Sequence, residues 1–370
     1  MPDARYEAFR LSLGMPSNPA APTMDELSKI PLSYASVSIG YAKEHTLLKK
    51  LDAIAAAGFQ AIELGFPDLL SFANQQQGDE ASEIKEDDYD GLCTAAKEVK
   101  KLCEAKKLKI LILQPFCNFE GWPEDSPERA DAWKRAEGWV RIMEAAGTDM
   151  LQVGSSDTPA EKIGTDRSRF VKDLQDLADM LAKKGFRVAY ENWCWSTHAP
   201  TWSDVWDICQ KVDRKNLGLC LDTFQSAGYE WADPTTESGM VEDGRSKEQV
   251  EKEWRASCDR LAKTVPKEKI FLLQISDAYR PKPTPLSKSD IDGLRPRGFW
   301  SHAYRPLPFQ GYLPVVDFAK AVLGTGFRGW WSYEIFDSGP DGKGKEYDLT
   351  DWAREGMQCE EKLKEACTKA

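Results

Sequence analysis

The chain has 370 residues, of which 41% are hydrophobic and 11% aromatic, so it can bury a large core. Its formal net charge of −11 argues against non-specific attraction to nucleic acid or to an anionic membrane surface. The sequence has no apolar run of about 18 residues, which argues against a transmembrane helix. We therefore expect neither nucleic acid nor a membrane among its partners.

Residues 1–30 are predicted to be a polar N-terminal leader that need not be ordered. They lack the charged start, long apolar segment and cleavage site of a secretory signal. The nine cysteines are scattered, and without a CxxC pair a cysteine zinc site is not expected. Several cysteines lie in apolar segments, where free buried thiols are usual, and we expect a reducing, cytoplasmic compartment.

Eight short apolar segments have the length and composition of buried strands. They are Ala35–Ile39, Gln60–Leu64, Lys109–Leu113, Met150–Val153, Arg187–Tyr190, Leu217–Leu221, Ile270–Ile275 and Gly329–Tyr333.

Amphipathic segments with helical spacing separate most of these strands. They are Thr46–Ala57, Asp88–Ala105, Pro127–Ala146, Arg167–Lys184, Trp202–Val212, Lys247–Thr264 and Pro314–Leu323. Alternation of strand and helix indicates parallel strands, and eight such units in one chain predict a closed (β/α)8 barrel. No GxGxxG follows the first strand, which argues against a dinucleotide-binding fold.

Two connections are longer than a minimal barrel needs. Residues 66–87 and 276–313 are predicted to be long loops on the catalytic face, where they are candidates for walls of the site. Residues 351–370 are predicted to form a final polar helix. Nothing in the pattern indicates a second domain, so residues 31–370 are expected to form one barrel.

Four oxygen-bearing side chains end consecutive predicted strands: Glu191, Asp222, Gln274 and Glu334. Strand ends converge at the mouth of a barrel, and three carboxylates gathered there repel one another unless a cation is present. Carboxylate and amide oxygens suit Mg²⁺, Mn²⁺ or Co²⁺ better than a thiolate-preferring ion. The pattern therefore predicts a divalent-metal site and does not identify the metal.

These residues carry a resemblance. ENW at 191–193, LDTF at 221–224, Gln274 and YEIF at 333–336 are similar to the metal-binding set of the xylose isomerase-like barrels. More specific stretches resemble the fungal 3-dehydroshikimate dehydratases, which convert 3-dehydroshikimate to protocatechuate. They are residues 50–69, LQPFCNFEG at 113–121, WSTH at 195–198, residues 205–228, WSHAYRPLPFQGYLP at 300–314 and SYEIF at 332–336.

The resemblance implies roles for individual residues. Glu191, Asp222, Gln274 and Glu334 become the metal ligands, with Glu191 and Glu334 also taking part in catalysis. His198 becomes the general acid/base that removes the α-proton and returns it to the departing β-hydroxyl. Arg305 becomes the partner of the substrate carboxylate. The further expected substrate contacts are Glu63, Gln114, Phe116 and Gln225, with Trp193, Trp195 and Phe119 lining the pocket.

The chain departs from the family pattern at several positions. Gln225 follows LDTF where Asn or His is usual, and Cys117 and Asn118 follow QPF where a basic or larger residue is usual. The segment after the fifth strand reads ENWCW, where the dehydratases typically have a small residue after the glutamate. These changes affect substrate contacts and leave the metal set whole. The reaction class is therefore better determined than the substrate.

Alternative functions remain open at this level. A sugar or cyclic-polyol isomerase or epimerase would use the same metal and enolate chemistry, but would gain little from Arg305. A dehydratase of a related keto-polyol, or a repurposed barrel, is kept open by Gln225 and Cys117. An abasic-site endonuclease needs several more histidine ligands than a chain with three histidines can supply. The sequence does not decide whether the chain forms a homodimer.

Overall fold

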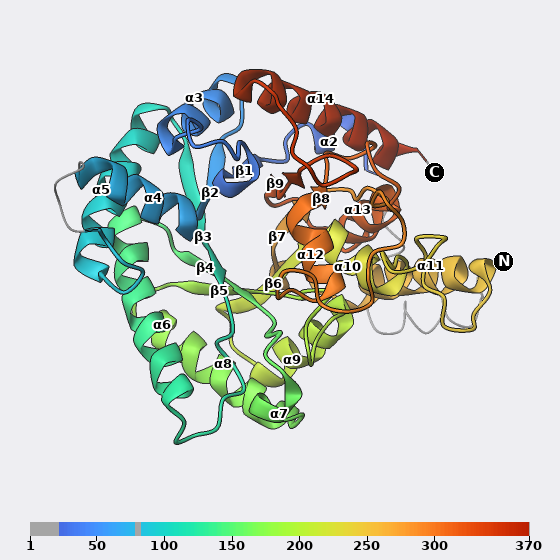
Figure 1. The fold of residues 1–370 in the computed structure, drawn as a ribbon, viewed down its shortest axis with the longest axis horizontal. Helices are drawn as coiled ribbons and strands as arrows, with labels where there is room; N and C mark the ends of the chain where they lie inside the picture. The colour runs from blue at the N-terminus through green and yellow to red at the C-terminus, as the bar shows by residue number, and fades with distance from the viewer. Residues whose placement is uncertain (1–21, 78–82, 370) are drawn as a thin grey trace.

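The computed structural model describes residues 22–77 and 83–369. Eight parallel strands close into a barrel in the order β1-β2-β3-β4-β5-β6-β7-β9 (Figure 1). They are β1 (Leu32–Ala35), β2 (Ala61–Gly65), β3 (Lys109–Phe116), β4 (Met150–Gly154), β5 (Arg187–Glu191), β6 (Leu217–Asp222), β7 (Ile270–Ile275) and β9 (Trp331–Tyr333). Pairing of Ser332 in β9 with Ser33 in β1 closes the barrel. The predicted (β/α)8 architecture is confirmed.

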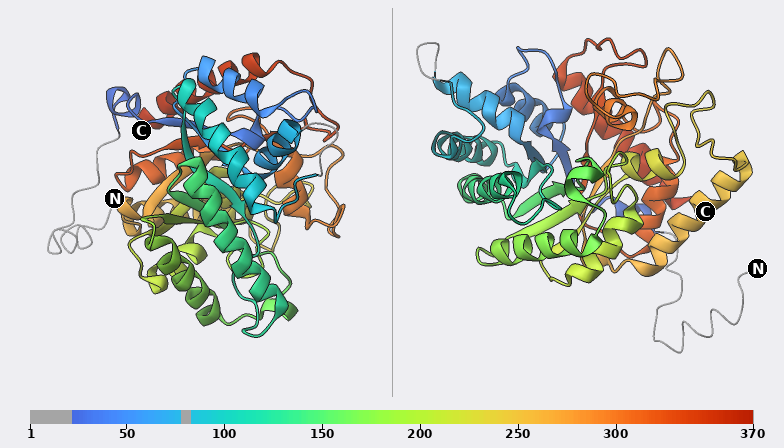
Figure 2. Two further views of the ribbon diagram at one scale, coloured as in Figure 1. Left: turned by 90° about the vertical axis from the view of Figure 1, so that its left-hand side faces the viewer. Right: turned by 60° about the horizontal axis from the view of Figure 1, so that its bottom comes forward.

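The helices surround the strands, as the two further views make clear (Figure 2). The longer ones are α3 (Leu47–Ala56), α4 (Phe66–Gln77), α5 (Tyr89–Ala105), α6 (Pro127–Ala146), α8 (Arg167–Ala182), α9 (Trp202–Val212), α10 (Thr223–Glu230), α11 (Lys247–Thr264), α12 (Pro296–Ala303), α13 (Val315–Gly324) and α14 (Leu349–Thr368). The short elements are α2 (Met24–Leu27), η1 (Ser36–Ser38), α7 (Ala160–Ile163), η2 (Lys267–Lys269), β8 (Tyr304–Arg305) and β10 (Phe336–Asp337). None of the helices in the described ranges is both long and apolar enough to cross a bilayer.

Local sequence signals fix where several helices begin and end. Ser126 caps α6 by accepting a hydrogen bond from the backbone N–H of Arg129, and Pro127 occupies the first turn, where no donor is lost. Gly147 ends α6 with a φ of +72°, which a residue with a Cβ rarely adopts. Thr201 and Asp204 form a reciprocal capping box at the start of α9.

The barrel interior is built in layers because side chains alternate along each strand. One buried layer comprises Ala61, Ile112, Met150, Ala189, Cys220 and Leu272. Two residues further along each of these six strands lie Glu63, Gln114, Gln152, Glu191, Asp222 and Gln274. The apolar layer therefore forms the floor on which a layer of polar side chains lies, at the C-terminal ends of the strands.

The structure differs from the predicted boundaries in the N-terminal part. The first strand is Leu32–Ala35, and Ser36–Ser38 form a 3₁₀ turn in which Ser36 Oγ accepts a hydrogen bond from the Gly65 N–H. Residues 1–21 of the predicted leader lie outside the described residues. Its last part is folded, because α2 packs against α14 and Leu27 is fully buried.

The two connections predicted as long loops contain regular structure. Residues 66–77 form α4, which buries Leu69 and Phe72 on one face, and residues 78–82 lie outside the described part. The connection 276–313 contains α12 and β8, and β8 pairs antiparallel with β10 beyond β9. Both predictions missed helices, although α4 buries Phe66, Leu69 and Phe72 at a spacing that a helix can place on one face. The boundary between leader and barrel stays a prediction.

Candidate active site

Three carboxylates meet at the C-terminal end of the barrel. Oxygen atoms of Glu191, Asp222 and Glu334 all lie within 4.8 Å of one another, and the three residues are buried. They come from the ends of β5, β6 and β9, as the strand pattern predicted. Mutual repulsion opposes ionisation of three buried carboxylates, and a nearby positive charge favours their ionised form.

Glu191 has one oxygen satisfied and one oxygen without a partner. Its Oε2 accepts a hydrogen bond of 3.1 Å from Trp193 Nε1 and a second one from Gln152 Nε2. Its Oε1 is buried and has no hydrogen-bond partner among the described residues. Burial raises the pKa of Glu191 well above its usual range, and the neighbouring Glu334 raises it further.

Arg305 supplies the positive charge within the cluster. Its Nη1 lies 2.9 Å from Glu334 Oε2, and its Nη2 donates to Asp222 Oδ2. Asp222 also caps α10, because its Oδ1 accepts from the N–H of Gln225 at 2.8 Å. Burial raises the pKa of Glu334 to about 7, although Arg305 opposes that shift.

Gln274 joins the carboxylates with its amide nitrogen toward them. Its Nε2 donates to Glu63 Oε2 at 2.8 Å and to Glu334 Oε1 at 3.3 Å, whereas its Oε1 accepts from Cys220 Sγ at 3.2 Å. Gln114 Nε2 donates to the same oxygen of Glu334 at 3.3 Å. Burial raises the pKa of Glu63 to about 8, and the charge of Glu334 adds to that effect. Glu63 and Gln114 therefore belong to the cluster.

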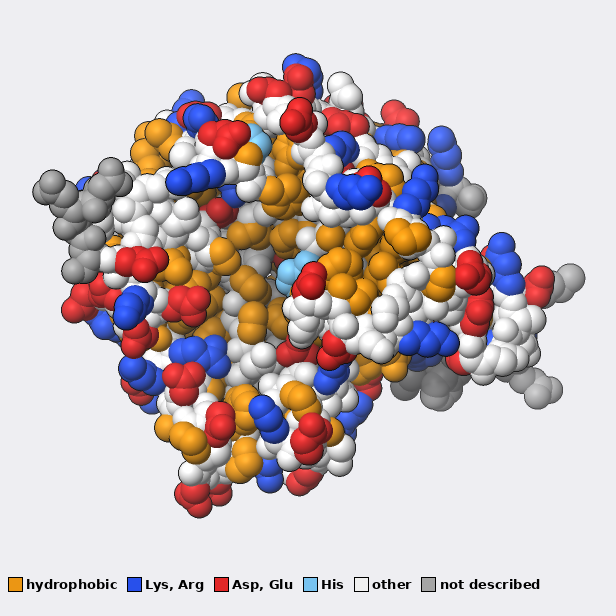
Figure 3. Space-filling view, viewed as in Figure 1, with side chains coloured by type: hydrophobic (Ala, Val, Ile, Leu, Met, Phe, Trp, Pro, Cys, Tyr) orange, Lys and Arg blue, Asp and Glu red, His pale blue; other side chains and the backbone are white. Residues whose placement is uncertain are grey.

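A pocket of about 360 Å³ opens above this cluster. In the view down the barrel, hydrophobic side chains gather around the middle of this face (Figure 3). Trp193 and Trp195 stack on each other in the pocket wall, with ring centroids 4.9 Å apart. The lining residues are Val37, Pro67, Gln114, Pro115, Cys117, Asn118, Gln152, Asp157, Trp193, Trp195, Gln225, Leu294, Ser301, His302, Arg305, Glu334 and Phe336.

Gln114, Gln225, Arg305 and Glu334 thus lie where the sequence predicted them, at the pocket. Phe116 does not: it is fully buried and packs against Trp139 with ring centroids 5.0 Å apart. The pairing of β3 with β4 is irregular between Leu113 and Phe116, which breaks the side-chain alternation on which the prediction depended. Phe119 is also buried and packs against Phe116 rather than lining the pocket.

His198 also lies away from the pocket lining. Its Nε2 lies 2.9 Å from Glu120 Oε1, and its ring stacks on Phe170 with centroids 3.9 Å apart. Glu120 accepts a hydrogen bond from the Tyr190 hydroxyl at 3.0 Å as well. Because Tyr190 and Glu191 are consecutive in β5, their side chains point to opposite faces of the strand. His198 therefore packs behind the barrel wall, on the face of β5 opposite Glu191.

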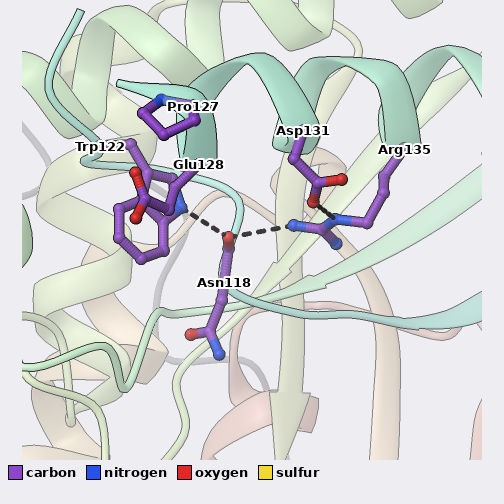
Figure 4. Close-up of a pocket in the computed structure, with 6 residues that line it drawn as sticks. All are labelled: Asn118, Trp122, Pro127, Glu128, Asp131 and Arg135. Atoms are coloured by element: carbon purple, nitrogen blue, oxygen red, sulfur yellow. Dashed lines mark hydrogen bonds and ion pairs between the residues drawn. The ribbon is translucent and has the colours of Figure 1, made fainter. Parts of the chain in front are cut away.

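A shallower pocket of about 340 Å³ adjoins the site and explains how the loop after β3 is held. The backbone carbonyl of Asn118 accepts from Trp122 Nε1 at 3.0 Å and from Arg135 at 3.2 Å (Figure 4). The side-chain amide of Asn118 points away from that pocket, and its Oδ1 accepts from Ser156 Oγ at 2.9 Å. Asn118 thereby joins the loops after β3 and β4.

Sequence reasoning missed several residues that line the pocket. Gln152 could have been found, because it lies two residues beyond Met150 of the apolar layer, as Glu191 lies two residues beyond Ala189. Asp157, Leu294, Ser301 and His302 lie in connections, where no strand register predicts which side chains face the pocket. Their placement depends on how Arg295 binds the carbonyls of Asp157 and Trp195.

Comparisons with known proteins agree with this fold. The model of the xylose isomerase-like TIM barrel family matches residues 51–363. A 3-dehydroshikimate dehydratase of Neurospora crassa is 34% identical over 325 residues, which are 84% of this chain and 86% of that protein. A 3-dehydroshikimate dehydratase of Pseudomonas aeruginosa is 32% identical over 90% of this chain.

The solved structure of a xylose isomerase-like TIM barrel/4-hydroxyphenylpyruvate dioxygenase fusion protein superposes with a TM-score of 0.65 and 28% identity over 90% of this chain. The chain spans 42% of that structure and 42% of the Pseudomonas aeruginosa relative. It spans most of the Neurospora crassa relative. The family model matches residues 51–363, the Neurospora crassa relative is 34% identical, and the eight strands close into a barrel. The chain therefore belongs to the xylose isomerase-like TIM barrel family.

Proposed function

We propose that the protein is a divalent-metal-dependent 3-dehydroshikimate dehydratase that forms protocatechuate. The observation that carries this proposal is a buried carboxylate cluster beneath a pocket, in a chain 34% identical to a 3-dehydroshikimate dehydratase over 84% of its length. The substrate class is accordingly a small cyclic keto acid. The nine cysteines, all within the described ranges, are unpaired, which supports a reducing, cytoplasmic compartment.

The cluster fits a divalent cation. Glu191, Asp222 and Glu334 bring three carboxylates together, whereas Arg305 brings a single positive charge. In the part of the chain that the structure describes, Glu191 Oε1 is buried without a hydrogen-bond partner, which is costly unless a cation satisfies it. We propose Glu191, Asp222, Glu334 and Gln274 as the ligands, the last after rotation of its amide. A hard ion such as Mg²⁺, Mn²⁺ or Co²⁺ suits this oxygen set.

When bound, the ion supplies Lewis acidity that polarises the substrate ketone and stabilises the developing enolate. Glu334 is the carboxylate of the triad that lines the pocket, so it lies where it can reach a proton of a bound substrate. We propose that it takes the α-proton. Trp193 and Trp195 flank the ring and exclude water, and Gln152 and Trp193 orient Glu191 by their hydrogen bonds.

The reaction balances without a further reactant. The electron pair of the α C–H bond forms the enolate, the β C–O bond then breaks, and the hydroxide leaves as water after taking up a proton. Transfer of one more ring proton to the ketone oxygen gives the aromatic catechol acid. Aromatisation makes the overall step irreversible.

Ultraviolet absorbance tests the proposal. Protein stripped with EDTA is reconstituted with Mg²⁺, Mn²⁺ or Co²⁺ and mixed with 3-dehydroshikimate, and mass spectrometry identifies the product. We expect a growing protocatechuate band with metal and none with EDTA. Bound metal by elemental analysis without any such band would refute the dehydratase, and sugars and cyclic polyols would be tested next.

A further inference from the structure

The connection after β7 brings α12 to the mouth of the barrel, and this helix carries part of the pocket wall. Ser301 and His302 of α12 line the pocket, and so does Leu294, which precedes the helix. Arg305, which contacts the carboxylate cluster, follows shortly after the helix ends. The position of α12 therefore decides where several side chains of the pocket lie.

Arg295, the N-cap residue of α12, joins that helix to two other connections. Its Nη1 donates to the carbonyl of Trp195 at 2.7 Å, and its Nη2 donates to the carbonyl of Asp157 at 2.9 Å and to Thr197 Oγ1 at 2.8 Å. Asp157 belongs to the connection after β4, whereas Trp195 and Thr197 belong to the connection after β5. One guanidinium therefore holds three connections together at the barrel mouth.

Arg295 acts on the pocket through its partners. Within the described residues, Arg295 is outside the pocket lining, whereas Asp157 and Trp195 belong to it. Trp195 Nε1 donates to Asp157 Oδ2 at 3.1 Å, which fixes the orientation of the indole. Helix α12 packs against the same indole, because a Cβ added to Gly298 would lie 3.4 Å from its ring. The bonds of Arg295 thus hold α12 beside the tryptophan wall.

A second arginine attaches α12 to a neighbouring helix. Arg297 Nε donates to the carbonyl of Gly228 in α10 at 2.8 Å, and its Nη2 lies 3.0 Å from Asp233 Oδ2. Helix α12 consequently lies beside α10 (Figure 1). Because these contacts do not involve Arg295, removal of Arg295 should loosen α12 from the connections after β4 and β5 without detaching it from α10.

The three acceptors of Arg295 suit a guanidinium. Its N–H groups lie in one plane and reach separate acceptors at once, whereas a lysine ammonium is a compact charge on a flexible stem. Hydrogen bonds from a charged donor are also stronger than neutral ones. A lysine at position 295 is therefore not expected to replace the arginine.

We propose that Arg295 is a positioning residue, which holds α12 and the connections after β4 and β5 in the arrangement that receives the substrate. This inference rests on the proposed function, because it takes a small cyclic keto acid to bind in this pocket. Without Arg295, the pocket wall must be ordered when the substrate binds, and that entropy cost weakens binding. The loss therefore affects KM more than kcat.

Chemical rescue tests the inference. Arg295→Ala removes the guanidinium from a partly buried position, and guanidinium chloride at millimolar concentration can occupy the space. We expect Arg295→Ala to raise KM for 3-dehydroshikimate about tenfold with little change in kcat, and added guanidinium to restore most of the loss. A defect of folding alone would stay or become worse, because guanidinium is a denaturant.

Two further variants make the test specific to the guanidinium at position 295. Arg295→Lys keeps the charge but loses the planar set of donors, and we expect it to retain the raised KM. Arg255→Ala, at an exposed position of α11, is the matched control, and we expect the wild-type KM with and without guanidinium. Sodium chloride at the same concentration controls for ionic strength and should not rescue Arg295→Ala.

Hydrogen–deuterium exchange of the full chain without substrate makes the test independent of turnover. Arg295→Ala should exchange faster than the wild type in residues 155–158, 193–198 and 296–303, and guanidinium should slow that exchange again. Wild-type exchange in Arg295→Ala overturns the inference, and so does a raised KM that guanidinium leaves unchanged. Absence of protocatechuate formation by the wild type refutes the dehydratase, while exchange that guanidinium reverses still supports the positioning role.

Discussion

The guanidinium of Arg305 lies 2.9 Å from Oε2 of Glu334, inside the carboxylate cluster rather than above it. A second contact joins it to Asp222. All three side chains are buried, so each charge depends on its partners more than a surface ion pair does. Arg305 therefore sets how much positive charge the cluster has before a metal binds.

Replacing Arg305 should make folding depend on metal. Arg305→Met leaves Asp222 and Glu334 without their counter-ion, and we expect the free energy of unfolding to fall by about 3 kcal/mol in EDTA. A bound divalent ion supplies the missing charge, so the loss should shrink in saturating Mn²⁺. Urea unfolding with and without Mn²⁺ measures both values. Equal stability of variant and wild type in EDTA would contradict the assigned role.

Removing one carboxylate should remove the metal. Glu191→Gln keeps the shape but replaces a carboxylate oxygen by an amide nitrogen, which does not ligate a cation. Within the described residues, Oε1 of Glu191 has no hydrogen-bond partner. We expect metal content well below one equivalent and a loss of kcat of about a hundredfold or more. Elemental analysis after gel filtration and the absorbance assay measure these effects. Glu361→Gln, at an exposed position of α14, is the control that should behave as wild type.

His198 is predicted to act on structure rather than on chemistry. His198→Gln disturbs a buried contact with Glu120, and we expect the free energy of unfolding to fall by about 1–3 kcal/mol. Activity per folded molecule should change less than about tenfold, below what loss of a general base costs. Steady-state kinetics and urea unfolding give the two numbers. A large loss of kcat at unchanged stability would restore His198 as the base.

Glu360 is expected to make stability depend on pH. It is 2% exposed in α14, and burial raises its pKa from 4.5 to about 7, although Lys364 lies 3.6 Å away. The folded state therefore binds the proton more tightly than the unfolded state. Its contribution is fully present below pH 4.5 and is lost as pH rises through 7.

Glu360→Gln should flatten this dependence. Between pH 4.5 and 7 the wild type is expected to lose about 3 kcal/mol relative to the variant. Urea unfolding of both proteins at several pH values gives the difference. The neighbouring Glu361→Gln, at an exposed position, should titrate as wild type, and parallel curves for wild type and Glu360→Gln would contradict the prediction.

The sequence by itself determined the barrel and the residues that end its strands. Hydrophobic segments of strand length alternate with amphipathic ones, and only parallel strands with outer helices bury both. Side-chain period along a strand then puts Glu191, Asp222 and Gln274 in one layer, above Ala189, Cys220 and Leu272. Each of these pairs is two residues apart in one strand, so the sequence alone predicts which layer each side chain joins.

Only the tertiary structure decided which other side chains reach the pocket. His198 and Trp195 both follow β5 in the same connection, yet His198 packs against Glu120 behind the barrel wall. Arg305 and His302 are three residues apart, yet Arg305 contacts the carboxylate cluster, whereas His302 is exposed at the pocket. Their positions depend on α12, β8 and β10, whose packing joins residues far apart in the chain. Contacts of that kind leave no periodic signal in the sequence.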